Sequence, residues 1–302
     1  MKLEEYLESN DYFQGDFITL IRMENLYKEF SNDQRFYLHN LWFGVDFSKV
    51  SKNFNYILSL NPDLDFPPVK KDFFEFSQGP FDKEKQDYID NVDYKSKIDI
   101  EILNNIPDHI SQIFCHANGV SHPKVTMVPI GRDYKNDRYF LEVDKFSKSD
   151  KNILCYYNCT LPPPELHYYG FLRKHIYDYC QNKNFVFCEH CTEHPRNYND
   201  EININFFRRL ASSKFMICPR GCGIDTYRMW ECIHMGCVPI VEKYDGYKQY
   251  EDLPILFVDH WKDYDKLTAE YLEEKWNEML KMEFNYEKLK LSYWRNLFMN
   301  LT

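Results

Sequence analysis

One segment, Cys218 to Val241, constrains the fold more than any other part of the chain. It follows the apolar run Phe215–Cys218, contains Gly221 and Gly223, and closes with an apolar run that begins at Val238. Apolar runs of this length predict buried strands, and the residues between them predict a loop and a short helix. We therefore expect a strand–loop–helix–strand unit. In open α/β sheets, ligands bind at the loop that follows such a strand.

The expected helix starts near Asp225 and ends near Gly236. Asp225 or Thr226 can cap its start, and Gly236 lies where a left-handed residue ends a helix. The first turn of a helix presents unpaired N–H groups and a positive dipole end, which suit a phosphate. Arg228 lies in that first turn, and its planar guanidinium matches phosphate oxygens. The segment thus predicts an anion site.

Glu231 follows Arg228 by three residues, so the two side chains share one helix face. A carboxylate there can accept two hydrogen bonds from the vicinal hydroxyls of a ribose. Phosphate followed by diol is the order of groups along a nucleotide-diphosphate sugar. The same spacing also fits a surface ion pair worth about 0.2–0.5 kcal/mol. The spacing alone leaves both interpretations open.

The segment resembles the signature of the exostosin-like glycosyltransferases, most closely their short soluble forms from large DNA viruses and bacteria. The resemblance rests on the order Pro-Arg-Gly-x-Gly-x-Asp, Arg, Trp-Glu, Gly and Pro-Ile-Val between Pro219 and Val241. It extends over about residues 105 to 300. Further motifs in the family's order are Phe114 to Asn118, His122-Pro-Lys124, Val128-Pro-Ile-Gly131, Asn158 and Thr160 followed by Arg173, and Pro254 to Trp261.

The resemblance implies an α/β protein of GT-B type, with two Rossmann-type domains facing a cleft. Alternating strands and helices after residue 150 independently predict a parallel sheet. The charged segment 135–151 predicts a surface connection, and we place the domain boundary there. The expected domains are an acceptor-side domain (1–148), a nucleotide-sugar-binding domain (149–283) and a terminal helix (284–302) that packs back on the first domain. Residues 1–35 have helical spacing, whereas 69–100 give no clear pattern.

The implied activity is transfer of a sugar from a nucleotide-diphosphate sugar, with UDP favoured, to a hydroxyl of an oligosaccharide or glycoprotein glycan. The resemblance implies inversion at the sugar, and arginines with a helix dipole can replace a metal at the diphosphate. Asn158 and Thr160 fit a local side-chain turn as well as a place in the donor site. Arg220 likewise fits either a solvent-facing position or the donor site. The donor-site residues we expect are Asn158, Thr160, Arg173, Arg220, Gly221, Gly223, Asp225, Arg228 and Glu231.

An inverting transferase needs a general base for the acceptor hydroxyl. We expect it from the first domain, across the cleft. Asp133 is the first candidate, because it follows the Pro129-Ile-Gly131 motif, and His116 is the second. His122 precedes a proline and better fits a turn residue. Asp46 stays open as a further candidate.

Neither a metal site nor another cofactor is predicted. Asp63-x-Asp65 lies in a proline-rich turn, and Asp263-x-Asp265 fits the capped start of a helix. Cys188-x-x-Cys191 with His194 is a single pair, whereas structural zinc sites use four ligands. The ten cysteines are expected to be free thiols.

Composition limits the partners. The formal net charge is −10, and nucleic-acid binding requires an excess of lysine and arginine. No apolar run is long enough to span a membrane, and the N-terminus is polar. We therefore expect no signal peptide and a cytoplasmic location, which for a viral protein means the host cytoplasm.

An alternative function is that of a non-catalytic protein of the same fold that binds glycans or nucleotide sugars. A Rossmann oxidoreductase is disfavoured, because no Gly-x-Gly-x-x-Gly follows the first strand.

Overall fold

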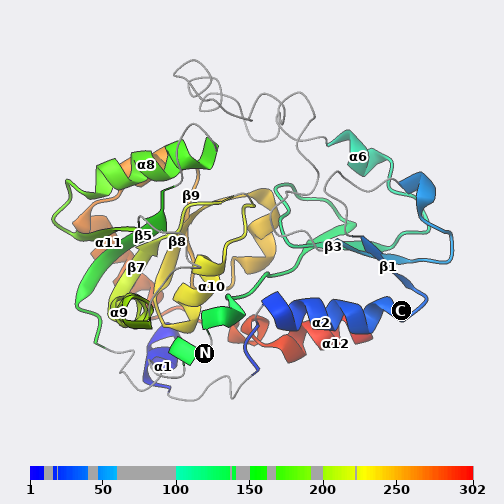
Figure 1. Ribbon diagram of the computed structural model, residues 1–302, viewed down its shortest axis with the longest axis horizontal. Coiled ribbons are helices and arrows are strands. Elements are labelled where there is room, and N and C mark those ends of the chain that lie inside the picture. The colour runs from blue at the N-terminus through cyan, green and yellow to red at the C-terminus, as the bar shows by residue number, and fades with distance from the viewer. Residues whose placement is uncertain are drawn as a thin grey trace.

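Two parallel sheets lie beside each other in the structure, a computed structural model (Figure 1). The α/β class with parallel sheets is confirmed, in agreement with a Rossmann-like GT-B fold. The structure describes residues 1–9, 16–18, 20–39, 47–59, 100–136, 138–140, 150–161, 168–191, 200–221 and 223–301. We refer to the described residues up to 140 as the first half and to those from 150 as the second half.

The first half contains a four-stranded sheet with the order β1-β2-β3-β4. Its strands are β1 (Phe36–His39), β2 (Tyr56–Ser59), β3 (Gln112–Cys115) and β4 (Val125–Met127). Neighbouring strands are parallel throughout, and Leu58 of β2 is in register with Phe114 of β3. Two short turns, η1 (Phe47–Lys49) and η2 (Tyr134–Asn136), belong to the same half.

Alternation along these strands divides the apolar side chains between two faces. Leu58 and Phe114 belong to the large core cluster, on the side of α2 (Leu20–Ser31) and α12 (Leu291–Met299). Ile57 and Ile113 point the other way and belong to a smaller cluster. That cluster also contains Leu103 of α6 (Glu101–Asn104). Both faces are therefore covered, as a parallel sheet requires.

The second half contains a five-stranded parallel sheet with the order β6-β5-β7-β8-β9. Tyr157 of β5 packs on α8, and Phe215 of β7 packs on α11, so these two helices cover one face. Tyr156 points to the opposite face, where it meets Phe206 of α9. The elements are β5 (Ile153–Thr160), α8 (Tyr168–Cys180), β6 (Val186–Cys191), α9 (Asp200–Ala211), β7 (Ser213–Ile217), α10 (Tyr227–His234), β8 (Val238–Glu242), η4 (Asp245–Tyr250), β9 (Leu256–Val258), η5 (Trp261–Lys266), α11 (Ala269–Met279) and η6 (Tyr286–Leu289).

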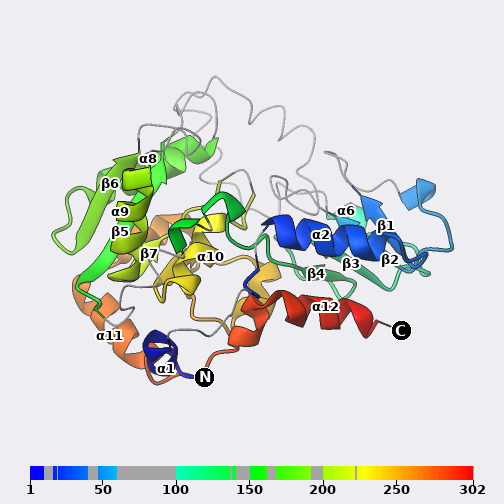
Figure 2. The same ribbon diagram turned by 60° about the horizontal axis from the view of Figure 1, so that its bottom comes forward.

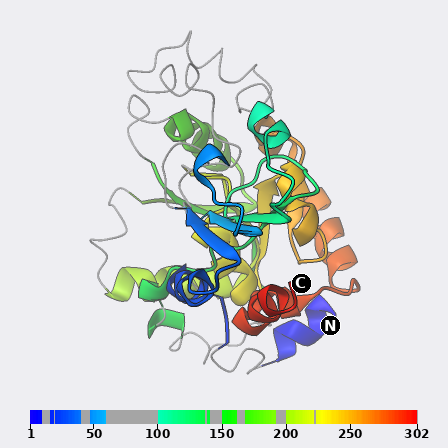
Figure 3. The same cartoon turned by 90° about the vertical axis from the view of Figure 1, so that its right-hand side faces the viewer.

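The two halves exchange helices. The first helix, α1 (Leu3–Glu8), packs on the second half: Tyr6 donates from its hydroxyl to the His234 carbonyl at 2.8 Å and stacks on Tyr286 at 4.3 Å. The last helix, α12, packs on the first half, where Phe298 contacts Phe30 and Phe114 edge-on. Figures 2 and 3 show α12 side by side with α2.

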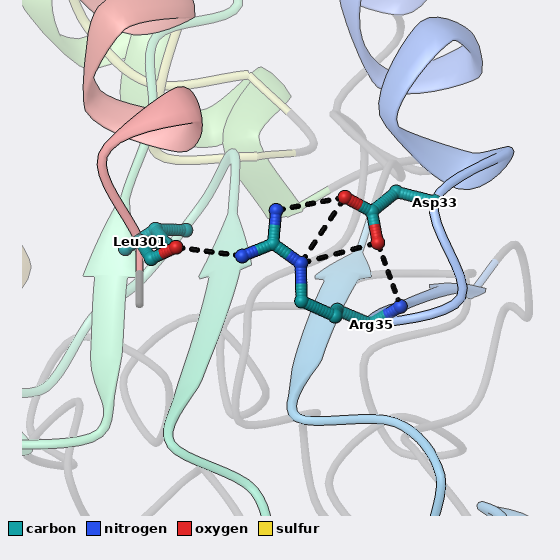
Figure 4. Close-up of polar contacts among 3 residues, drawn as sticks. All are labelled: Asp33, Arg35 and Leu301. Atoms are coloured by element: carbon teal, nitrogen blue, oxygen red, sulfur yellow. Dashed lines mark hydrogen bonds and ion pairs between the residues drawn. The ribbon is translucent and has the colours of Figure 1, made fainter.

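An arginine joins the end of α12 to the start of β1 (Figure 4). Arg35 forms an ion pair with Asp33 at 2.8 Å and donates from Nη1 to the Leu301 carbonyl at 2.7 Å. The two charged side chains are 40% and 34% exposed. Ion pairs this exposed contribute only about 0–1 kcal/mol. The contact therefore directs the end of the chain, while Phe298 supplies the buried surface.

The halves also meet where η4 touches the loop after β3. Gly246 lies against the backbone of Asn118: a Cβ at this glycine would stand 1.6 Å from the Asn118 carbonyl oxygen. We predict that Gly246→Ala lowers the free energy of unfolding by about 3 kcal/mol, because backbone on both sides prevents local adjustment. Urea unfolding followed by circular dichroism measures this. Lys248→Ala, at an exposed position in the same turn, is the control and should change stability by less than about 0.5 kcal/mol. Equal losses in the two variants would contradict the prediction.

Several expectations need correction. The described residues within 1–35 form two helices, α1 and α2, and Phe17 forms an isolated bridge to Lys290. Strands β1 and β2 were not expected. The interpretation of 135–151 as a purely surface segment is wrong for Tyr139 and Phe140, which are buried. The domain boundary at 148/149 stays a prediction, since residues 141–149 lie outside the described residues.

Candidate functional site

The strand order of the second sheet reverses at β5, which lies between β6 and β7. In doubly wound sheets, ligands bind outside the carboxyl ends of the strands at such a reversal. Here those ends are Thr160 of β5 and Ile217 of β7. The chain leaves β7 through Arg220 and Gly221 and then enters α10. The segment that stands out in the sequence thus lies where the fold predicts a ligand.

Arg173 of α8 joins the two strand ends. Its Nη1 donates to the Thr160 carbonyl and its Nε to the Arg220 carbonyl, both at 3.2 Å. A Cβ on Gly221 would lie 3.1 Å from Arg173 Nη2, so the glycine makes room for the guanidinium. The structure therefore brings Arg173, Thr160, Arg220 and Gly221 together and places a half-buried positive charge at the reversal.

Arg220 does not face solvent, contrary to one of the two interpretations above. It is 8% exposed, and its guanidinium carbon lies 5.8 Å from the centre of the Tyr244 ring. The loop also bonds to itself, because the Gly221 N–H donates to the Gly223 carbonyl at 3.2 Å. This internal bond gives the loop a defined shape, with Gly223 buried beneath it.

Arg228 lies in the first turn of α10, as expected. Its guanidinium carbon stacks over Phe206 of α9 at 4.0 Å from the ring centre. Its Nη1 forms an ion pair with Glu231 Oε2 at 2.9 Å. The side chains are 24% and 3% exposed respectively, so the arginine reaches the surface and the carboxylate does not. The ion pair exists, but it is not a surface pair.

Glu231 also binds a residue of the first half. Asn136 in η2 donates from Nδ2 to Glu231 Oε1 at 2.9 Å. Burial raises the pKa of Glu231, while the Arg228 charge and the Asn136 hydrogen bond act in the opposite direction. The carboxylate expected to hold a ribose is thus occupied by two donors of the protein itself.

Asp225 lies at the contact between the two halves. It is 3% exposed and accepts the Ile130 N–H at 2.9 Å and the Trp230 indole N–H at 2.8 Å. The Thr226 N–H also donates to it. Burial raises the pKa of Asp225 to about 8, although these three donors favour the charged form. Asp225 therefore has a structural role: it holds the start of α10 against the Pro129-Ile-Gly131 motif.

Asn158 lies near the end of β5 within a polar cluster. It donates to the Tyr156 hydroxyl at 3.0 Å and, more weakly, to Glu189 Oε2 at 3.4 Å. The Tyr156 hydroxyl donates to the same carboxylate, which also forms an ion pair with Arg209 of α9. Asn158 is half-buried, and its amide is thus held by neighbouring side chains rather than by a local turn.

The candidate bases differ in exposure. His116 is completely buried, and its Nδ1 lies 3.2 Å from the Val128 carbonyl. His122 accepts the Lys124 N–H at 3.1 Å, which agrees with a turn residue. Asp133 is half-buried, accepts the Lys135 N–H at 3.0 Å and lies close enough to raise the pKa of Glu231. Asp46 lies outside the described residues.

His116 makes stability sensitive to acid. Burial lowers its pKa to about 4 from an ordinary value of 6.5. The folded state therefore resists protonation, so the contribution is complete above pH 6.5 and is lost as the pH falls towards 4. We predict that the free energy of unfolding falls by about 3 kcal/mol over this interval. Urea unfolding at several pH values measures it, and His116→Gln should flatten the profile. A profile that stays equally steep in the variant would assign the acid sensitivity to other groups.

The motifs with metal-like spacing are only partly described, and Asp63 and Asp65 lie outside the described residues. Among the described residues, no group of three or more His, Cys, Asp or Glu side chains can hold a metal ion. Asp263 bonds the His260 N–H at the start of η5, as a capping residue does, and Asp265 pairs with His175. Cys188 is a free thiol on β6, while His194 lies outside the described residues.

Three site residues were missed by the sequence reasoning: Asn136, Glu189 and Phe206. Asn136 and Glu231 are 95 positions apart, and no local spacing indicates their contact. Glu189 carried a detectable signal, because it lies near the end of an expected strand. Phe206 lies on an expected helix, but nothing in the sequence distinguishes it from its neighbour Phe207.

Comparison with known proteins identifies the family of the chain. The model of the RXYLT1 C-terminal domain family matches residues 144–300 of this 302-residue chain. The chain belongs to this family, which is related to the exostosin-like glycosyltransferases. The resemblance noted in the sequence is thereby confirmed. No curated protein matches the chain.

A helix that crosses a membrane needs about 20 mostly apolar residues. Within the described part of the chain, none is both long enough and apolar enough to cross a bilayer.

Proposed function

We propose that the chain is a glycosyltransferase that transfers a sugar from a nucleotide-diphosphate sugar, with UDP favoured, to a glycan hydroxyl. One observation carries the proposal: Arg173 and Arg228 both lie at the reversal point of the second sheet, next to the start of α10. Two arginines and a helix N-terminus suit a diphosphate. Membership of a glycosyltransferase-like family supports the same chemistry.

The diphosphate is the leaving group, and its charge grows as the glycosidic bond breaks. Fixed positive groups that face this charge accelerate the reaction. Arg173 is held by two backbone carbonyls, and Arg228 is held by Phe206 and Glu231. Both guanidinium groups are therefore oriented before the substrate arrives. We propose that they supply the charge that a metal supplies in other transferases.

Inversion requires a base on the acceptor side of the sugar. We propose Asp133 for this role, because it is half-buried and belongs to the first half while lying near Glu231. His116 is fully enclosed and offers no surface to an acceptor. The acceptor would be an oligosaccharide or the glycan of a glycoprotein. The alternative, a non-catalytic binding protein, follows if the fold binds the donor without turnover.

A two-stage experiment tests the proposal. Thermal-shift screening against UDP, GDP, CMP and their sugars should show stabilisation by one nucleotide, because a ligand that binds only the folded state raises its stability. The family name refers to a xylosyltransferase, so UDP-xylose is the first donor to test. Transfer in the presence of EDTA, abolished by Asp133→Asn, would support the full mechanism. Binding without turnover would support the alternative, and no shift at millimolar nucleotide would refute both.

A further inference from the structure

The contact between Asn136 and Glu231 extends the donor site into the first half of the chain. The two oxygens of Glu231 serve separate donors at the same distance: Oε2 binds Arg228 Nη1 and Oε1 binds Asn136 Nδ2, each at 2.9 Å. Asn136 comes from η2, five positions after Gly131, and Arg228 from α10. One carboxylate thus connects the two halves of the molecule.

Burial decides what this carboxylate can do. The Glu231 side chain is 3% exposed, and both of its oxygens already accept a hydrogen bond within the protein. At this exposure the carboxylate offers a ribose almost no accessible surface. The Arg228 side chain is 24% exposed. The arginine is therefore the member of the group that a ligand can touch, and Glu231 lies behind it.

A buried carboxylate stays ionised only if neighbouring groups stabilise its charge. Three charged side chains act on Glu231: Arg228 from its own helix, and Arg132 and Asp133 from the first half. The two arginines favour the charged form, whereas Asp133 disfavours it. Asn136 adds a hydrogen bond without adding a charge. An aspartate at this position would instead bring a further negative charge against Glu231.

We propose that Asn136 is a positioning residue of the donor site: it holds Glu231, and Glu231 holds the Arg228 guanidinium against the diphosphate. This inference rests on the proposed function. It replaces the expected contact of Glu231 with a ribose by an indirect role. The first half of the chain then contributes to donor binding through Asn136 as well as to the acceptor side.

Isothermal titration with UDP, with GDP in parallel, tests the inference at pH 8 and pH 5.5 on the intact chain. Asn136→Ala should weaken binding about tenfold at both pH values, because one hydrogen bond to a charged group is lost. Asn136→Asp should weaken it at least as much at pH 8. Acidification favours a proton shared between the introduced carboxyl group and Glu231, and the protonated carboxyl can donate as the amide does. The loss of UDP affinity in Asn136→Asp should therefore be smaller at pH 5.5 than at pH 8.

Asn182→Asp is the matched control, since it adds the same charge at an exposed position after α8. Its affinity for UDP should equal that of the wild type at both pH values. Asn136 is half-buried, and circular dichroism would confirm that its variants fold. If both Asn136 variants bind as the wild type does, or bind more tightly, the inference is overturned while the proposed function stands. If the wild type binds neither nucleotide, the proposed function fails and the inference fails with it.

Discussion

Arg228→Ala should lower the rate of sugar transfer about 10²–10³-fold, the effect typical of removing one fixed group that faces developing charge. UDP affinity should fall about tenfold or more, because a charge-assisted contact to phosphate disappears. The reason lies in the geometry: this guanidinium stacks on Phe206, pairs with Glu231 and is still 24% exposed. Initial rates with the donor selected by thermal shift, together with UDP titration, measure both effects.

Two further variants separate catalysis from folding. Removing Arg228 leaves a buried Glu231 without its counter-ion, which itself destabilises a protein. Arg228→Lys retains the charge but loses the planar stack, so it should fold and show an intermediate loss of rate. Arg208→Ala removes an exposed arginine from α9 and should transfer at the wild-type rate. A folded Arg228→Ala variant with normal turnover would exclude Arg228 from the donor site.

Asp225→Ala should lower the free energy of unfolding by about 4 kcal/mol. The carboxyl group is buried and accepts N–H groups from Ile130 and Trp230, at 2.9 and 2.8 Å. Truncation removes the acceptor of these two donors and of the Thr226 N–H, at about 1–3 kcal/mol for each donor that stays buried. Denaturant unfolding at pH 7 gives the difference in free energy directly.

The comparison for this prediction is Asp108→Ala, at an exposed position before β3, which should change stability by less than about 0.5 kcal/mol. Asp225→Asn is also informative, because its amide N–H₂ would face groups that themselves donate, and it should recover little of the loss. If Asp225→Ala instead kept its stability and lost only nucleotide affinity, Asp225 would be a donor ligand rather than a structural residue.

The second half was more accessible to sequence reasoning than the first. Alternating apolar runs and helical spacings predicted β5, α8, α9, β7, α10 and β8, because each of these elements buries a regular face. Gly236 indeed ends α10 with a left-handed residue, with φ at 67°. In the first half, β1 and β2 have only four residues each and lie among aromatic and charged residues. Their pairing depends on neighbours far along the chain.

Some residues of the candidate site could be predicted from the sequence, and others could not. Arg173, Arg228 and Gly221 could be named from local motifs and from the family resemblance. Their partners could not: Phe206 contacts Arg228 through packing between helices, and Asn136 reaches Glu231 across 95 positions. The burial of the site's side chains could not be predicted from the sequence either. The spacing of Arg228 and Glu231 is the same whether the carboxylate is exposed or enclosed, and only the tertiary structure shows that it is enclosed.

The position of α12 has a consequence for synthesis on the ribosome. Phe298 completes the packing around Phe30 and Phe114. Translation proceeds at about 5–20 residues per second, so Phe298 is made roughly ten to forty seconds after Phe114. Throughout that time one side of the nascent first sheet lacks its final cover and exposes apolar surface to chaperones and to other nascent chains. The sheet that is made first therefore completes its packing only after the last helix has been made.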